Sequence, residues 1–353
     1  MIFANFSNGD YLIMEHAPWD GLCISDVILP CFVWVMGVST ALSFNSKLCK
    51  GVSRWMLFRR IVTRSLSMII IGVVININLV QDRKDFPSKL RIPGVLQLIG
   101  VAFFIASSTH LLFFKRNNED QEQCWHPVTK ILLCKGDYLT MLIILSVHTL
   151  IMFFLEVPGC PRGYHGPGGL HMNGRYQNCT GGAAGYLDLL VFGENHIFQK
   201  PAMQSIYNTT IPFDPEGLLA TLTSSFLVFI GIQGATAYVL AGGFRNDGLI
   251  PVNKNLWSLS FVLTIGFISL TAFTVLYVTV DVKRLWNGGP FHFPGMNPLF
   301  LFIGHALFSQ MFPWKWKVAG YSRLQRILLD LWGAAVWIGV SFYLYYKKIF
   351  LAL

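Results

Sequence analysis

Charged residues are scarce in this 353-residue chain. Asp, Glu, Lys and Arg together make up 13% of it, whereas hydrophobic residues make up 53%. A soluble domain typically has about a quarter charged residues, so this composition excludes an ordinary soluble fold. The chain is predicted to be a polytopic membrane protein.

Other features are missing as well. The sequence has no CxxC pair and no cluster of His and Cys, so we predict no metal site. It shows no internal repeat with paired broken helices, which is the usual sign of a secondary transporter. Its first residues lack the basic region, apolar core and cleavage site of a signal peptide. They read like the last turns of a helix that begins before Met1, so we expect an N-terminal truncation.

Eight stretches are apolar and long enough to cross a bilayer, which takes roughly 20 helical residues. Because they are continuous rather than alternating, they favour helices over a closed barrel. The predicted spans are 22–44, 55–80, 92–114, 138–157, 218–240, 256–280, 296–312 and 327–346. We therefore expect an all-α fold, a polytopic transmembrane helix bundle of about eight or nine spans, forming a single domain over residues 1–353.

Positive charge gathers at the ends of the predicted spans. The clusters are Lys47, Lys50, Arg54, Arg59, Arg60 and Arg64 at one junction, and Lys115, Arg116, Lys130 and Lys135 at another. Such clusters follow the positive-inside rule, so both loops are predicted to be cytosolic. The formal net charge of +9 is thereby explained by the membrane, and we expect no nucleic-acid partner.

The long connection 158–216 then falls on the opposite, lumenal side. It is rich in Gly and Pro and contains N-glycosylation sequons at Asn178 and Asn208, which we expect to be modified. Cys160 and Cys179 either form a disulfide there or bond to a part of the protein outside this chain, because spacing alone does not fix pairing.

The same charge rule leaves a problem at the C-terminus. With the loop around Lys115 inside, the last predicted span leaves Lys347 and Lys348 outside, where lysines are disfavoured. Either a span is missing after Glu216, or the tail breaks the rule.

A short polar stretch, residues 15–21, stands directly before the first apolar run. It contains His16, Trp19 and Asp20, and the run that follows has a carboxylate of its own, Asp26. A charged side chain at the centre of a membrane helix costs about 3 kcal/mol, so such groups are rarely kept for packing alone. We predict that the chemistry is located here.

Six segments in one order resemble the heparan-alpha-glucosaminide N-acetyltransferase family. They are HAPWDGL at 16–22, RIPGVLQ at 91–97, NCTGGAAG at 178–185, DPEG at 214–217, PVNKNLWS at 251–258 and FPGMN at 293–297. The resemblance implies a homodimeric enzyme of the lysosomal membrane that takes acetyl groups from cytosolic acetyl-CoA. It also implies transfer to the terminal glucosamine of heparan sulfate in the lumen. The implied active-site histidine is His16, and the implied supporting asparagine is Asn5.

Histidine suits this reaction. A glucosamine amine is mostly protonated at acid pH and must lose a proton before it attacks a thioester, and histidine titrates at about pH 6.5. His16 acts either as this base or as a covalent carrier of the acetyl group. Asn5 either donates its amide to the thioester oxygen or only orients the imidazole.

The remaining candidates each keep two interpretations. Asp20 and Asp26 either orient the imidazole or hold sugar hydroxyls. Trp19 either stacks on a sugar face or anchors the chain at the interface. Glu216 either positions the amino sugar or belongs to an ordinary helix start. Arg91 either binds a phosphate, as in acetyl-CoA, or a sugar acid, or it only holds a helix end.

Two departures from the family pattern affect activity. Family members carry a large lumenal domain and a further span before the first residue here, and a longer connection with an additional span around residues 241–250. We therefore predict that this chain is impaired or inactive unless both losses are errors of gene prediction. The alternatives to the enzyme are an inactive pseudoenzyme and a polytopic transporter.

Overall fold

The computed structural model describes residues 2, 15–79, 88–113, 135–201, 203–233, 253–308, 311–314 and 323–351. Over these residues the regular structure is helical, apart from an isolated parallel bridge between Gly21 and Asn253. The longer helices are α2 (Ile24–Cys49), α3 (Arg54–Leu79), α4 (Val95–Phe113), α6 (Lys135–Phe154), α7 (Gly182–Phe192), α9 (Leu218–Gln233), α10 (Leu259–Tyr277), α12 (Pro298–Phe308) and α13 (Arg323–Tyr346). The shorter ones are α8 (Gln204–Tyr207) and α11 (His292–Met296). The predicted all-α class is confirmed.

Six of the described helices are long and apolar enough to cross a membrane, namely α2, α3, α4, α6, α10 and α13. They coincide with six of the eight predicted spans, and the chain is a polytopic helical membrane protein. Helix α9 has 16 described residues, and the rest of the predicted span 218–240 lies outside the described part. The number of spans stays a prediction.

The predicted span 296–312 contains a break. Helix α11 ends at Met296, Asn297 has a non-helical backbone with φ −132° and ψ 49°, and α12 then runs for 11 residues. A helix of that length rises about 16 Å, roughly half of the hydrocarbon core. Helix α12 is therefore too short to cross a bilayer without further residues.

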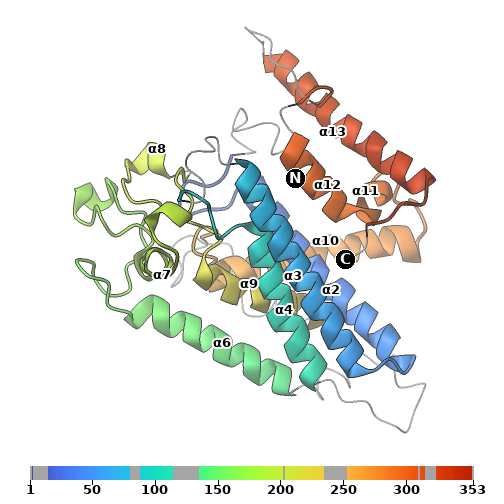
Figure 1. Cartoon of the computed structure of the whole chain (residues 1–353), viewed down its shortest axis with the longest axis horizontal. Helices are drawn as coiled ribbons and strands as arrows, with labels where there is room; N and C mark the ends of the chain where they lie inside the picture. Colours follow the sequence, from blue (N-terminus) through green and yellow to red (C-terminus); the bar gives the residue numbers. More distant parts are fainter. Residues whose placement is uncertain are drawn as a thin grey trace. The chain divides into compact units, whose positions relative to one another are not determined.

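The chain divides into two compact units. One comprises residues 17–22 and 30–270, and the other comprises residues 1–16, 23–29 and 271–353. In the first unit, α4 packs against both α3 and α9, and Figure 1 shows α3 and α4 side by side. The apolar stretch of α4 is 61% buried, against 28% for α3 and 22% for α6. Helix α4 is thus a core helix, while α3 and α6 present apolar side chains outward, as lipid-facing helices do.

Two glycines let α2 and α9 touch. A Cβ on Gly37 would lie 2.1 Å from the carbonyl oxygen of Val228, and one on Gly231 would lie 2.1 Å from the carbonyl oxygen of Trp34. Small residues at helix contacts allow this close backbone approach in membranes. Any larger residue at either position would push the two helices apart.

The connection 158–216 folds into short helices fastened by a disulfide. Cys160 and Cys179 are bonded to each other, which decides the pairing that the sequence left open. Asn178 and Asn208 are both exposed, so both sequons present their side chains to solvent. A disulfide and accessible sequons are consistent with an oxidising, lumenal compartment.

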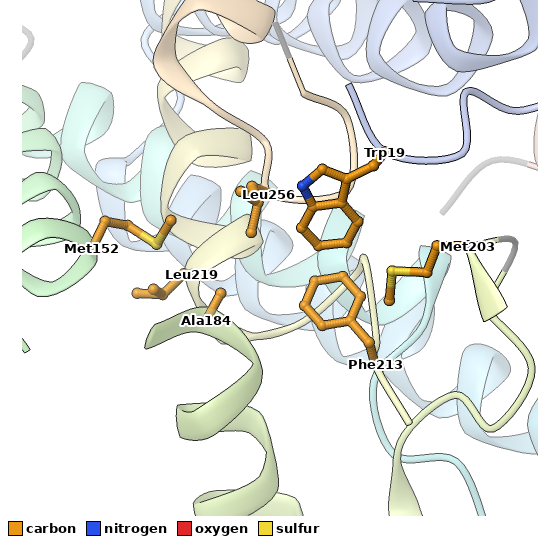
Figure 2. Packing of buried hydrophobic residues seen from close by; sticks show 7 residues of the cluster. All are labelled: Trp19, Met152, Ala184, Met203, Phe213, Leu219 and Leu256. Carbon is orange, nitrogen blue, oxygen red and sulfur yellow. The ribbon is translucent and has the colours of Figure 1, made fainter. Parts of the chain in front are cut away.

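A buried apolar cluster fixes this connection to the helix ends around it. Its members are Trp19, Met152, Ala184, Met203, Phe213, Leu219 and Leu256. Figure 2 shows the ring of Phe213 beside the ring of Trp19, with the centroids 5.5 Å apart. Residues from six separate segments meet here, so the cluster holds in place the loops that carry the polar residues of this unit.

In the second unit, α12 and α13 pack together through Leu301 and Trp337. The Asn297 amide donates to the carbonyl oxygen of Ile349 at 3.0 Å and accepts from the N–H of Leu351 at 2.8 Å. At the break before α12, the side chain of Asn297 is therefore hydrogen-bonded to the segment that follows α13.

Candidate active site

His16 and Asp26 form a hydrogen-bonded pair in the second unit. The distance between His16 Nδ1 and Asp26 Oδ1 is 2.7 Å. The Asp26 side chain is fully buried, whereas that of His16 is 49% exposed. The pair thus joins a fixed carboxylate to an imidazole that is open to a reaction partner.

The start of α2 places Asp26. The residue lies in the first turn, where the helix dipole favours an acidic side chain, and its Oδ2 accepts the N–H of Cys23 at 3.0 Å. Ser25 Oγ donates to the carbonyl oxygen of Glu15 at 2.8 Å, so the residue before His16 is tied to the same turn. Local helix-capping contacts therefore set the geometry of the pair.

The contact with Asp26 has a chemical consequence for His16. Because a carboxylate accepts, Nδ1 of the imidazole is the donor. A neutral ring then carries its lone pair on Nε2, the nitrogen that takes a proton or attacks an acyl carbon. Of the two interpretations of Asp26, the contact supports ring orientation. Asn5 lies outside the described residues, so its role stays a prediction.

Trp19 belongs to the first unit and is 2% exposed. Its indole N–H donates to the carbonyl oxygen of His165 at 2.8 Å, and its ring packs on Phe213. These contacts suit an anchor, and they leave almost no ring face for a sugar. A sugar contact of Trp19 stays a prediction that the described contacts do not support.

Asp20 is exposed and accepts a hydrogen bond from Asn253 Nδ2 at 3.1 Å. Asn253 is itself buried, and its Oδ1 accepts from the N–H of Leu256 at 2.9 Å. Sequence reasoning assigned no role to Asn253, although its polar motif directly before an apolar span was a usable signal. The open carboxylate of Asp20 is suited to a sugar hydroxyl or an ammonium group.

The guanidinium group of Arg91 is hydrogen-bonded to two acidic residues in the first unit. Its Nε donates to Asp214 Oδ2 at 2.8 Å and its Nη2 to Asp214 Oδ1 at 2.6 Å, and Nη2 also contacts Glu216 Oε2. The guanidinium lies over the ring of Phe198, 4.7 Å from the centroid. This contact set suits the holding of a helix end more than the binding of a phosphate.

Electrostatics agree with that assignment. Burial tends to lower the pKa of Arg91, but Glu216 and Asp214 together raise it above its ordinary value. Burial raises the pKa of Glu216, while the charge of Arg91 lowers it. Glu216 is 9% exposed and paired inside the protein, and its contact with an amino sugar stays a prediction.

Asp188 is a buried acid that sequence reasoning missed. Its Oδ1 accepts the N–H of Leu218, the first residue of α9, at 2.9 Å. A Cβ on Gly217 would lie 1.8 Å from Asp188 Oδ2, so only glycine fits there. Burial raises the pKa of Asp188 to about 7, with Asp214 adding to the rise and the Leu218 hydrogen bond opposing it.

A second histidine–aspartate pair was also missed. The distance between His110 Nδ1, in the last turn of α4, and Asp137 Oδ2, in the first turn of α6, is 2.8 Å. Both side chains are buried, at 9% and 0% exposure. Two ionisable residues at facing ends of apolar runs were the signal for it. Among the residues that the structure describes, no group of three His, Cys, Asp or Glu side chains is arranged to hold a metal ion.

Comparison with known proteins covers nearly the whole chain. It is 37% identical to heparan-alpha-glucosaminide N-acetyltransferase of Mus musculus over 99% of this chain and 58% of that protein. It is 38% identical to the Homo sapiens protein of the same name, over 99% of this chain and 57% of that protein. The chain thus spans about half the length of the curated relatives it matches, and no protein-family model matches it.

Proposed function

This chain is a relative of the heparan-alpha-glucosaminide N-acetyltransferases along nearly all of its sequence, and we propose that it performs the acyl transfer of that family. The donor is cytosolic acetyl-CoA, the acceptor is the terminal glucosamine of heparan sulfate, and the enzyme lies in the lysosomal membrane as a homodimer. The observation that carries the proposal is the pair of His16, which lies in the first of the six family motifs, and Asp26, which lies in the first turn of α2.

The pair has the parts that acyl transfer to an amine requires. Asp26 holds Nδ1 as the donor, so Nε2 of His16 accepts the proton that the glucosamine nitrogen loses as it attacks the thioester carbonyl. The thiolate of coenzyme A leaves as the amide forms. In the alternative route Nε2 attacks the thioester first and the acetyl group then passes from the ring to the amine.

The direction of transfer is supported by the sidedness of the loops. The basic clusters at the ends of the predicted spans favour the cytosol, and the disulfide-bonded connection with its exposed sequons favours the lumen. His16 is hydrogen-bonded to Asp26 in the first turn of α2, and the opposite end of this helix carries Lys47. We therefore place His16 at the lumenal end, where the acceptor sugar arrives.

We assign the remaining candidates by what their contacts leave accessible. Asp20 is exposed and is our choice for a contact with the sugar. Asn5 is our choice for the donor to the thioester oxygen. Arg91 and Glu216 pair with each other and serve chiefly to hold the DPEG turn, and Trp19 anchors the stretch that follows His16.

The test is acetyl transfer from labelled acetyl-CoA to a glucosamine-terminated acceptor, in membranes that contain the full chain. We expect label in the product for the parent chain and none for His16→Ala. His171→Ala serves as the matched control, because His171 is a histidine of the connection outside the proposed site, and it should retain activity. Rapid quenching that recovers labelled His16 selects the covalent route, and its absence during turnover selects direct transfer.

Two outcomes contradict the proposal. If the chain binds acetyl-CoA and transfers nothing, even when joined to the additional segments of its longer relatives, the pseudoenzyme interpretation is correct. Net uptake of an unmodified sugar by sealed vesicles, without acetylation, supports a transporter instead.

A further inference from the structure

The two N-glycosylation sequons of the connection 158–216 differ in what the fold leaves accessible. At a sequon, a glycan transferase must reach the Asn side chain and the hydroxyl of the residue two positions later. Asn208 and Thr210 are both exposed. Asn178 is exposed as well, but Thr180 is 4% exposed, and its Oγ1 is buried with no hydrogen-bond partner in the described part of the chain. The folded protein therefore presents both recognition groups at the second sequon and only the Asn side chain at the first.

The backbone around Gly168 covers Thr180. A Cβ on Gly168 would lie 2.8 Å from Thr180 Oγ1 and 3.0 Å from the backbone nitrogen of Thr180. The N–H of Gly181, directly after Thr180, donates to the carbonyl oxygen of Gly166 at 3.0 Å. The end of the first sequon is thus fastened to the segment that covers it. Its hydroxyl becomes accessible only if these two segments separate.

The middle residue of the first sequon is Cys179, which is disulfide-bonded to Cys160 and is 3% exposed. Its N–H donates to the carbonyl oxygen of Tyr176 at 3.2 Å, so the backbone turns at the sequon instead of running extended. A sequon must separate from the rest of the chain to enter a transferase. The disulfide opposes this separation, because it ties the residue between Asn178 and Thr180 to the start of the connection.

The disulfide can close soon after the sequon is synthesised. Cys160 and Cys179 are 19 residues apart, and a ribosome adds about 5–20 residues per second, so the second cysteine follows the first after about 1–4 s. With the connection on the lumenal side, as proposed above, the disulfide then forms over seconds to hours, depending on the oxidant. Glycan transfer to Asn178 and closure of the disulfide therefore compete within the same interval.

We propose that Asn178 accepts a glycan only while Cys179 is a free thiol, and that Asn208 accepts one whether or not the disulfide has formed. In the transfer, the Asn Nδ2 loses a proton and displaces the diphosphate of a lipid-linked oligosaccharide. In the competing step, the two thiols pass two protons and two electrons to the disulfide of a thiol oxidoreductase, which becomes a dithiol. The order of these steps decides whether the connection carries one glycan or two. The proposal does not depend on acetyl transfer, because glycans are measured without turnover.

The test is cell-free synthesis of the full chain into microsomes while an acceptor tripeptide blocks glycan transfer. The block is removed after the disulfide has formed, and mass spectrometry then measures the occupancy of each sequon. We expect a glycan at Asn208 and none at Asn178. Cys160→Ser cannot form the disulfide and should gain both glycans, as should the parent chain treated with dithiothreitol. Cys31→Ser, which removes a free cysteine of α2, is the matched control and should behave like the parent chain.

Three results would overturn the proposal. They are a glycan at Asn178 of the disulfide-bonded parent chain, no glycan at Asn208 of the same chain, and no gain at Asn178 in Cys160→Ser. Cys179→Ala keeps the sequon and removes the same disulfide, so it must give the same result as Cys160→Ser. Occupancy is measured on newly made chains within the microsomes, so the test holds even if a variant does not reach its final fold.

Discussion

The two histidine–aspartate pairs in the part of the chain that the structure describes have nearly the same hydrogen bond and different surroundings. His16 and Asp26 are joined over 2.7 Å, and His110 and Asp137 over 2.8 Å. The His16 side chain is 49% exposed, whereas that of His110 is 9% exposed and stacks on Phe44. The bond alone therefore does not mark a catalytic group. The exposure of the imidazole distinguishes the two pairs. We expect the exposed His16 to take part in catalysis and the buried His110 to join helices α4 and α6.

Removing the open imidazole gives the largest expected effect. His16→Ala should lower acetyl transfer by about 10²–10⁴-fold, the usual contribution of a positioned base. Because the His16 side chain is half exposed and Asp26 keeps its contact with the N–H of Cys23, the thermal unfolding midpoint should fall less than in a variant of the buried pair. Transfer rates and the midpoint are measured on the same preparation. An inactive variant that is also unfolded would contradict this division of roles.

Removing the buried carboxylate of Asp137 should lower stability and leave activity nearly unchanged. Asp137→Ala removes the buried acceptor that His110 Nδ1 contacts and should cost about 1–3 kcal/mol of stability. Activity per folded molecule should stay close to that of the parent chain. Thermal unfolding in nanodiscs checks the first statement, and transfer normalised to folded protein checks the second. Asp137→Asn, which keeps an acceptor for His110, is the control and should lose less.

Asp26→Asn tests whether ring orientation matters at the open pair. The amide keeps an acceptor for His16 but removes the negative charge of the carboxylate from the pair, so transfer should fall by about tenfold or more. Stability should change less than in Asp137→Ala. Unchanged activity would show that Asp26 only closes the start of α2.

Asp188 is a third buried carboxyl group, and its described hydrogen bond is to a backbone N–H rather than to an imidazole. Its pKa is about 7 in the folded protein, raised by burial from an ordinary 3.8. The stability that protonated Asp188 contributes is therefore full below pH 3.8 and is lost as the pH rises through about 7.

Asp188→Asn cannot ionise and keeps an acceptor for Leu218. Between about pH 5 and about pH 8 it should lose less stability than the parent chain, by on the order of 1–2 kcal/mol. Unfolding midpoints across this range measure the difference. Parallel curves for variant and parent would place the pKa of Asp188 outside the window.

Much of the fold follows from hydropathy alone. A run such as residues 95–113 is apolar over the length of a bilayer, and in lipid its backbone groups are satisfied only within a helix. The break at Asn297 was not predicted, because the hydropathy of 296–312 is continuous across it. Pro298 disfavours a helical backbone at Asn297, and hydrogen bonds to Ile349 and Leu351, which are distant in sequence, hold the Asn297 side chain there.

The candidate site divides in the same way. His16 and Asp26 are 10 residues apart and one helix start joins them, so a local motif sufficed to bring both forward. Arg91 and Glu216 were each predicted to contact a ligand. They contact each other instead, and because they are 125 residues apart in the sequence, neither motif alone indicated this pair. Asp188 drew no attention, because a lone acid in a polar connection has no pattern.

Composition, the order of the motifs and the placement of basic residues thus suffice for the membrane class, the family resemblance and the choice of His16. They suffice because lipid solvation and short-range spacing act along the chain. Folding alone decides which acids are paired, which histidine is open and which cysteines are bonded. Those outcomes depend on burial and on contacts between distant segments, and the cost of an unpaired charge away from water selects among them.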